Sequence, residues 1–384
     1  MQFIKRHWQW IVQAAVLLVI LSWLVIAWIN LNQNLAARNF GLGFDFLWNQ
    51  AGFAIGESPI PFSPTDFYIT ALGVGLLNTC KVVVLGLFLA TFIGIGVGLG
   101  RLSSNWLVNR LASVYVQGLR NTPLLLQLLF WYSAFFLSLP APDAPLNLYN
   151  AIFLSKQGMS LPGLQGTASF AQGLPLIGLG GLMAIALHMV LRRRQLKLGA
   201  QPPWTKALPS LALIGMVAIA LILSGGQSPV TINMPSFDTQ AGVQGGLKLT
   251  AEYSTLVIGL SLYTASFIAE IVRAGIEAVP KGQWEASKSL GLNPLQVMGY
   301  IIFPQALRVI LPPLTSQYLN LAKNSSLAIA IGYPDIYAIA SPTLNQTGRP
   351  IEVILILMAV YLTISLTLSL LMTLYSRSTR WGQV

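Results

Sequence analysis

Eight stretches of this chain are long and apolar enough to cross a lipid bilayer, and they constrain its fold more than any other feature. A spanning helix needs about 20 mostly apolar residues. The chain is 54% hydrophobic and only 9% charged, whereas about a quarter of a soluble domain is charged. We therefore predict an all-α integral membrane protein with about eight transmembrane helices. They lie near residues 10–30, 69–100, 111–138, 173–191, 207–224, 252–278, 300–323 and 351–376.

The basic residues predict how these helices are oriented in the membrane. The chain has 22 Lys and Arg against 11 Asp and Glu, a net charge of +11. Most of the cations lie in alternate connections between apolar segments, which is the positive-inside pattern and predicts that both termini are cytoplasmic. The first apolar run, Trp10 to Ile29, exceeds the about 7–15 residues of a signal peptide, so we predict a retained anchor. The same placement of charge argues against nucleic-acid binding.

A short polar stretch between the sixth and seventh apolar segments predicts a helix on the membrane surface, from Lys281 to Leu290. Gly291 suits the left-handed position past a helix end, and Pro294 cannot continue the helix. Small side chains in this stretch allow another surface to approach closely, while Glu285 and Lys288 supply charge. The small residues are Ala286, Ser287 and Ser289.

This stretch resembles the coupling segment of ABC importer permeases, whose pattern is Glu-Ala-Ala, three residues and Gly. Here the pattern stands as Glu285, Ala286 and Ser287, followed by Gly291, with Ser in place of the second Ala. The sequences VRAGIEAVPKGQWEAS, FPQALRVILPPL and LNLAKNSSLAIAIGYPD resemble the polar amino acid uptake (histidine/glutamine permease-like) branch. Residues 120–124, Arg-Asn-Thr-Pro-Leu, resemble the same branch. The chain most resembles the longer permease subunit of general L-amino acid importers.

The resemblance implies a type I importer permease core of five helices, to which this chain adds three. The N-terminal helix and a periplasmic loop take up residues 1–68. The core then falls in two parts, 69–138 and 251–384, separated by an inserted segment, 139–250, with two predicted spans. The flanks of the insert, Leu139–Gln172 and Ser224–Gly246, are rich in Pro, Gly and Asn, and we predict outer loops there.

The resemblance also implies a function and a set of partners. The chain would be the permease of a binding-protein-dependent ABC importer for L-amino acids in a bacterial inner membrane. It would contact the ATPase through Gly282, Glu285, Ala286, Ser287 and Gly291. No phosphate-binding GxxxxGK[ST] motif is present, so ATP and Mg would bind a partner, and no catalytic residue or cofactor is expected here. The implied partners are a second homologous permease, two ATP-binding subunits, a periplasmic amino acid-binding protein and membrane lipid.

Polar residues inside the apolar segments are candidates for the substrate path. Glu270 lies three residues before Arg273, and this pair would serve equally well as a gate or as a structural ion pair. In the seventh segment, three prolines predict a broken helix. They precede Asn320, Asn324 and Ser325, whose side chains suit a zwitterionic substrate. The prolines are Pro304, Pro312 and Pro313.

Helix packing explains two further motifs. The small-residue pairs Gly94/Gly98 and Gly96/Gly100 favour close approach of helix backbones. Pro123 frees backbone groups inside the third segment, and nearby polar side chains such as Gln127 can satisfy them.

An ion-coupled secondary amino acid transporter is the alternative function. It would call for inverted repeats and buried acids, but Glu270 is the one central acid and no internal repeat is visible. An enzyme would need clustered His, Cys, Asp or Glu. The chain has two distant histidines and one cysteine, so neither a metal site nor a nucleophile is predicted.

Overall fold

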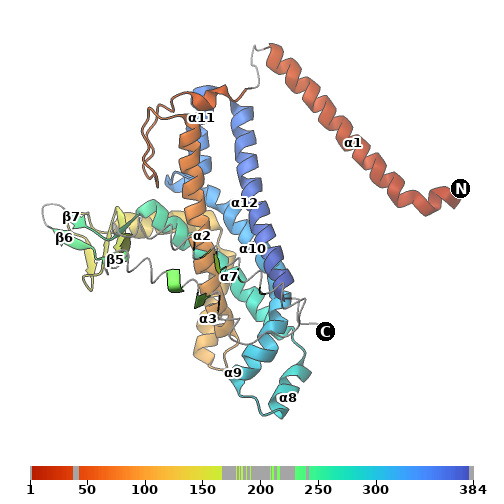
Figure 1. Ribbon diagram of the computed structural model, residues 1–384, viewed down its shortest axis with the longest axis vertical. Helices are drawn as coiled ribbons and strands as arrows, with labels where there is room; N and C mark the ends of the chain where they lie inside the picture. The colour runs from red at the N-terminus through yellow and green to blue at the C-terminus, as the bar shows by residue number, and fades with distance from the viewer. Residues whose placement is uncertain are drawn as a thin grey trace. The chain divides into compact units, whose positions relative to one another are not determined.

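The computed structural model describes residues 2–37, 43–166, 230–238 and 242–379, together with scattered positions between 179 and 216. Long helices dominate it (Figure 1). They are α1 (Gln2–Ala37), α2 (Tyr68–Arg101), α7 (Ala251–Glu277), α10 (Phe303–Asn324) and α12 (Pro350–Thr379). The shorter helices are α3 (Trp106–Asn121), α4 (Leu124–Leu129), α8 (Lys281–Ser289), α9 (Pro294–Gln296) and α11 (Ile336–Thr347).

Among the described residues, five helical segments are long and apolar enough to cross a membrane, and they confirm five of the predicted spans. They are Val12–Asn30, Tyr68–Arg101, Ala251–Glu277, Pro294–Ile331 and Pro350–Arg377. The two spans predicted in the insert, near 173–191 and 207–224, lie mostly outside the described residues and stay predictions. The chain divides into two compact units, 1–80 with 334–371 and 81–333 with 372–384.

In the first unit, the start of α2 packs with α11 and α12 around an apolar core. A 3-10 turn, Asp45–Trp48, contributes Phe46 to this core. The Tyr68 hydroxyl donates to Oε1 of Gln346 at 2.8 Å, which joins α2 to α11. The buried core residues are Phe46, Ala51, Tyr68, Ala71, Leu72, Ile336, Ile339, Ala340 and Val353.

Asp335 caps the N-terminus of α11 and is fully buried in the first unit. Its carboxylate accepts hydrogen bonds from the Ala338 N–H at 2.8 Å and from the Tyr361 hydroxyl of α12 at 3.4 Å. Next to it, Thr79 Oγ1 of α2 accepts from the Ile336 N–H at 3.0 Å. Burial raises the pKa of Asp335 to about 6, although its hydrogen bonds favour the charged form.

In the second unit, α7 is the most deeply buried of the candidate spans. The second half of α2 packs on it through glycines: a Cβ at Gly94 would lie 2.6 Å from Cβ of Ile268, and one at Gly98 would lie 2.8 Å from the Ala269 carbonyl oxygen. This confirms the packing predicted for Gly94 and Gly98. Gly96 faces open space, so the second predicted pair, Gly96/Gly100, makes no comparable contact with α7.

The flanks of the insert, predicted as outer loops, contain short strands that the sequence analysis did not predict, and their outer position stays a prediction. One four-stranded antiparallel sheet has the order β1-β2-β3-β8. Two further antiparallel pairs are β4-β5 and β6-β7. The strand bounds are Leu146–Leu148, Ile152–Ser155, Gly158–Leu161, Gly163–Gly166, Val230–Asn233, Ser236–Asp238, Gly242–Gln244 and Leu247–Thr250, from β1 to β8. Leu247–Thr250 alternates apolar and polar residues, a period-two pattern typical of a strand, whereas Ile152–Ser155 is a short apolar run that ends in Ser.

The third predicted span, 111–138, is not one continuous helix. It is divided into α3 and α4, and a π-helical turn follows at Phe130–Phe135. Pro123 causes the division because a residue before proline is driven to extended backbone, and Thr122 has φ −102° and ψ 128°. The Gln127 amide donates to the carbonyls of Leu119 at 2.9 Å and Thr122 at 3.0 Å, as predicted for the freed backbone groups.

The prolines of the seventh segment do not break its helix, contrary to the prediction. Pro304 lies in the first turn of α10, where its missing N–H costs nothing, and the helix continues through Pro312 and Pro313. The irregular backbone lies elsewhere: a π-helical turn, Val297–Ile302, precedes α10, and a 3-10 segment, Ser325–Ile331, follows it.

Substitution of Gly94 by Ala should destabilise the protein, because the new methyl group would overlap Ile268. Overpacking of this kind costs about 1–3 kcal/mol. The matched control is Gly96→Ala, because its new methyl group meets no atom within 4 Å. Alanine also favours the helix over glycine by up to about 1 kcal/mol. Thermal unfolding in detergent should show a lower Tm for Gly94→Ala alone. Equal Tm values for the two variants would contradict the packing.

Asp335→Asn should remove a pH dependence of stability. Since the pKa of Asp335 is 3.8 unperturbed and about 6 when folded, the folded state binds the proton more tightly. The resulting stability is full below about pH 3.8 and is lost as the pH rises through about 6. When the pH rises from 5 to 7.5, loss of this contribution lowers the free energy of unfolding by about 1–1.5 kcal/mol. The fall in Tm over that range should be smaller for Asp335→Asn; an equal fall would contradict the assignment.

Candidate coupling helix and charged cluster

The predicted surface helix is present as α8, and its end is built as the sequence indicates. Gly291 has φ +73°, and its N–H donates to the Lys288 carbonyl at 2.9 Å. The left-handed conformation suits glycine and turns the chain sharply after the helix. Asn293 then caps α9 in a capping box with Gln296, with Pro294 at the first helical position.

One face of α8 packs against the rest of the protein, and its other side chains are mostly exposed. Ser287 is buried and its hydroxyl donates to the Gln283 carbonyl at 2.5 Å. The Gln305 amide of α10 donates to Oε1 of Gln283 at 3.1 Å, which ties α8 to a candidate span. The other predicted coupling residues, Gly282, Glu285, Ala286 and Gly291, are exposed. Large apolar side chains beside them, Leu290 and Leu295, are 77% and 85% exposed.

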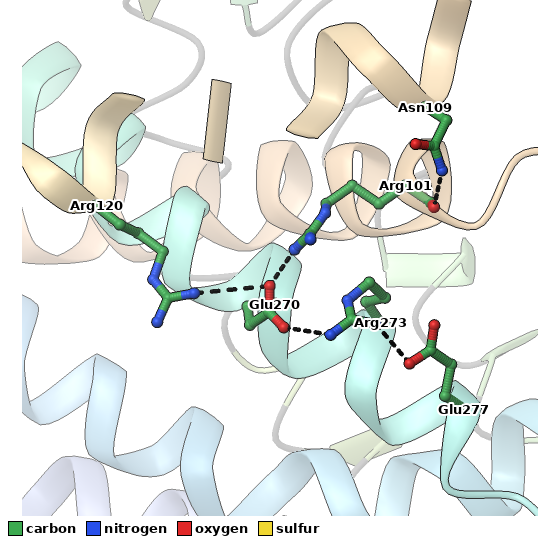
Figure 2. A network of polar contacts seen from close by, with 6 residues as sticks. All are labelled: Arg101, Asn109, Arg120, Glu270, Arg273 and Glu277. Carbon is green, nitrogen blue, oxygen red and sulfur yellow. Dashed lines mark hydrogen bonds and ion pairs between the residues drawn. The ribbon is translucent and has the colours of Figure 1, made fainter. Parts of the chain in front are cut away.

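A second feature is a charged cluster around Glu270 of α7 (Figure 2). Its Oε1 accepts from Arg273 at 2.6 Å, and its Oε2 pairs with Arg101 and lies 3.6 Å from a nitrogen of Arg120. Arg273 also pairs with Glu277 at 2.5 Å. The predicted Glu270–Arg273 pair is therefore present. It belongs to a cluster that links the end of α2, the end of α3 and α7.

The cluster borders a cavity of about 390 Å³. Arg120 also lies over the ring of Phe267, with 5.1 Å from its guanidinium carbon to the ring centroid. Three guanidinium groups face two carboxylates, so the cluster has excess positive charge. Such an arrangement can stabilise helix packing, and it can also attract the carboxylate of a passing molecule. The cavity is lined by Arg101, Val116, Gln117, Arg120, Asn121, Phe267 and Glu270.

The remaining substrate-path candidates lie at the end of α10. Asn320 is exposed, Asn324 is half-buried and Ser325 is fully buried. The Ser325 hydroxyl donates to the Ala322 carbonyl at 2.8 Å, so its donor is already used by the backbone. No hydrogen bond or ion pair joins these three residues to Glu270 in the described parts of the chain. The role of all four in a substrate path stays a prediction.

A family model described as "Binding-protein-dependent transport system inner membrane component" matches residues 90–381. This chain belongs to that family. Its mostly helical fold, with five candidate membrane spans among the described residues, agrees with an inner membrane component. The charged cluster and α8 both lie within the matched residues, whereas α1 lies outside them.

Three relatives match this permease over most of its length. The general L-amino acid transport system permease protein of Rhizobium johnstonii is 43% identical, with 90% of this chain and 86% of the relative covered. A putative amino-acid ABC transporter permease protein of Escherichia coli is 42% identical, with 97% and 93% covered. The glutamate/glutamine/aspartate/asparagine transport system permease protein of Rhodobacter capsulatus is 40% identical, with 96% and 92% covered.

Sequence reasoning missed several residues of these sites in the permease. Arg101 pairs with Glu270, and no pattern near it in the sequence indicates this. Glu277 could have been found, because it lies four residues after Arg273 on the same helix face. The Gln283–Gln305 contact has no local signal, since the two residues lie on different helices. In the described residues, no three His, Cys, Asp or Glu side chains gather to hold a metal ion.

Glu270→Gln should lower the Tm of the permease, because three arginines lose their shared carboxylate. Breaking a buried pair costs about 3–5 kcal/mol, and exposed pairs contribute about 0–1 kcal/mol. The Glu270 side chain is 27% exposed, so we expect an intermediate loss of about 1–3 kcal/mol.

The matched control is Glu277→Gln, since Glu277 is 50% exposed and has one ion-pair partner, Arg273. Its Tm should change little. A larger loss of stability for Glu277→Gln than for Glu270→Gln would show that Glu270 is not the centre of the cluster.

Proposed function

We propose that the permease is a membrane subunit of an ABC importer that carries L-amino acids into the cytoplasm. The observation that carries this proposal is α8, a short helix held at Ser287 and otherwise exposed, which ends at a left-handed Gly291. A rigid, exposed helix of this kind can receive force from a partner. The names of the relatives support amino acids as the substrate class.

The energy would come from ATP hydrolysed, with Mg, on a separate subunit. The exposed face of α8, with Glu285 and Ala286, would lie against that subunit, with Leu290 and Leu295 filling apolar space on it. Movement of α8 would reach α10 along two connections. One is the Gln283–Gln305 hydrogen bond, and the other is the chain itself, through α9 and the π-helical turn at Val297–Ile302.

A polar stripe on α10 supports a substrate path along that helix. Ser316, Asn320 and Lys323 are all exposed and lie four and three residues apart, which places them on one helix face. Exposed polar side chains are costly in lipid, so this face must meet protein or water. A second homologous permease would cover it, and the two chains would enclose the path. Asn320, Asn324 and Ser325 would then contact a zwitterionic substrate.

Glu270 and its arginines would lie where the path leaves the membrane. Glu270 lies seven positions before Glu277, the last residue of α7, so the cluster lies at the end of α7 that leads into α8. Excess positive charge beside the cavity would attract the substrate carboxylate, while Glu270 would hold the cluster together. The full assembly would contain two permeases, two ATP-binding subunits and a periplasmic amino acid-binding protein. Both termini of this chain would lie on the cytoplasmic side of a bacterial inner membrane.

Purification of the tagged permease from native membranes tests the proposal. We expect an ATP-binding subunit and a second permease to come with it. Gly291→Arg should lose the ATPase and amino acid uptake while still inserting in the membrane, because φ +73° is strained for Arg and a bulky cation would alter the contact surface. Gly291→Asn is the control, since Asn tolerates the left-handed conformation, and it should keep most uptake.

The opposite outcome is also defined. A permease that is purified alone, and that moves amino acids in vesicles without ATP, would be an ion-coupled secondary transporter. Normal uptake by Gly291→Arg would show that α8 does not couple ATP hydrolysis to transport.

A further inference from the structure

The four-stranded sheet of the insert has one polar face, and the strand register defines it. Phe153 pairs with Ser160, and Ser160 pairs with Lys248 on the next strand. Side chains two residues apart in a strand share a face, so Ser155, Gly158 and Thr250 also lie on this face. The residues of this polar sheet face are Phe153, Ser155, Gly158, Ser160, Lys248 and Thr250.

The opposite face is apolar, and it anchors the sheet to the helical part of the second unit. Leu154 and Met159 pack against a small core of Phe136, Leu139 and Ala251. Backbone bonds strengthen the junction: the Lys156 N–H donates to the Pro140 carbonyl, and the Ala251 N–H donates to the Gln157 carbonyl, both at 3.0 Å. The polar sheet face therefore points away from the helices.

The β6-β7 hairpin partly covers the polar sheet face and leaves a cavity of about 570 Å³. Phe237 of β6 stacks on Phe153, with 6.5 Å between ring centroids. Lys156 and Lys248 line the cavity, are exposed, and form no ion pair within the described parts of the chain. The acid that lines it is Glu252, whose carboxylate accepts from the Tyr132 hydroxyl at 2.9 Å. The cavity thus has excess positive charge at its rim.

The cavity lies at the end of α7 remote from α8. Strand β8 ends at Thr250, which caps the first turn of α7, and α8 follows the last turn (Figure 1). A helix of 27 residues is about 40 Å long. If α8 meets the ATPase in the cytoplasm, the polar sheet face is on the outer side of the membrane. The inference below rests in this respect on the proposed function.

The exposure of the two lysines indicates which kind of partner they suit. Exposed charges are screened by water and salt, so they hold a small free ligand weakly. In protein association, by contrast, exposed rim charges steer the encounter and raise its rate. A half-open cavity with small polar side chains on its floor can also accept a side chain that protrudes from a protein surface.

We infer that this cavity receives an acidic surface segment of the soluble amino acid-binding protein, and that Lys156 and Lys248 steer its docking. The strands of the insert thus form a platform beside the outer end of α7, a helix that runs from the docking surface to the coupling helix. A carboxylate from the binding protein would enter between the two ammonium groups, with the hydroxyls of Ser155 and Ser160 nearby.

The test measures association between the complete complex in nanodiscs and the soluble binding protein that stimulates its ATPase activity. Lys156→Gln with Lys248→Gln should lower the association rate constant about three- to tenfold at low salt, with little change in the dissociation rate constant. The difference should shrink at high salt, because the Debye length falls to about 3 Å at 1 M. Lys156→Arg with Lys248→Arg should keep the wild-type rate.

A control separates local docking from net charge. Tyr149→Glu with Leu164→Glu changes the charge by the same two units, at side chains that are 99% and 80% exposed and do not line the cavity. This control should associate at nearly the wild-type rate. An equal slowing in the control, or an unchanged rate in the Lys→Gln variant, would overturn the inference.

Two readouts keep the outcomes distinct. Unstimulated ATPase activity of the Lys→Gln complex should match wild type, which shows that the sheet and helices are folded. If the wild-type complex binds no soluble protein and has no ATPase activity, the proposed function itself fails. If wild type binds and the Lys→Gln variant binds equally fast, the importer assignment survives and the docking inference is wrong.

Discussion

The carboxylate of Glu270 lies in an apolar helix, where an unpaired charge is costly, and three guanidinium groups surround it. This requirement joins the ends of α2 and α3 to α7. The same helices also pack closely: Gly98 brings the α2 backbone against the Ala269 carbonyl, one residue before Glu270. Charge pairing and close packing therefore act at the same place, near Glu270. Together they fix the position of α7 relative to α2 and α3, close to the end of α7 that leads into α8.

Helix α7 connects the two surfaces that we propose for docking and for coupling. At its first turn it is joined to the strands of the insert, and after its last turn the chain enters α8. A buried helix moves as a rigid body because its side chains are closely packed. A displacement at one end therefore reaches the other, which is what a transporter needs if substrate arrives on one side and energy on the other. The contact of Gln283 with Gln305 extends this connection to α10.

The sequence predicted most of the helical fold, since the signals there are local. Long apolar runs predicted five spans that the structure contains, and Gly291 and Pro294 marked the end of α8 correctly. The errors came from proline. At Pro123 the helix divides, whereas at Pro312 and Pro313 it continues. Proline removes a backbone hydrogen bond in each case, so its presence alone does not predict whether the helix continues.

The candidate sites were predicted unevenly, for a similar reason. The residues of α8 and the Glu270–Arg273 pair are close in sequence, so spacing alone identified them. Arg101 and Gln305 act on partners far away in the chain, and no pattern near them indicates this. The strands of the insert were missed because their Pro, Gly and Asn content masked a short alternation of apolar and polar residues. Their pairing joins β3 to β8 across more than eighty residues of chain.

By itself, the sequence determined that this chain is a helical membrane protein, because hydrocarbon admits only long apolar segments whose backbone is paired internally. It also determined where the proposed coupling helix, α8, begins and ends, because capping and turn preferences act within a few residues. The tertiary structure alone decided which charges meet around Glu270 and which face of the β1-β2-β3-β8 sheet is polar and open. Those arrangements depend on contacts between segments that are distant in the chain, and such contacts leave no local pattern in the sequence.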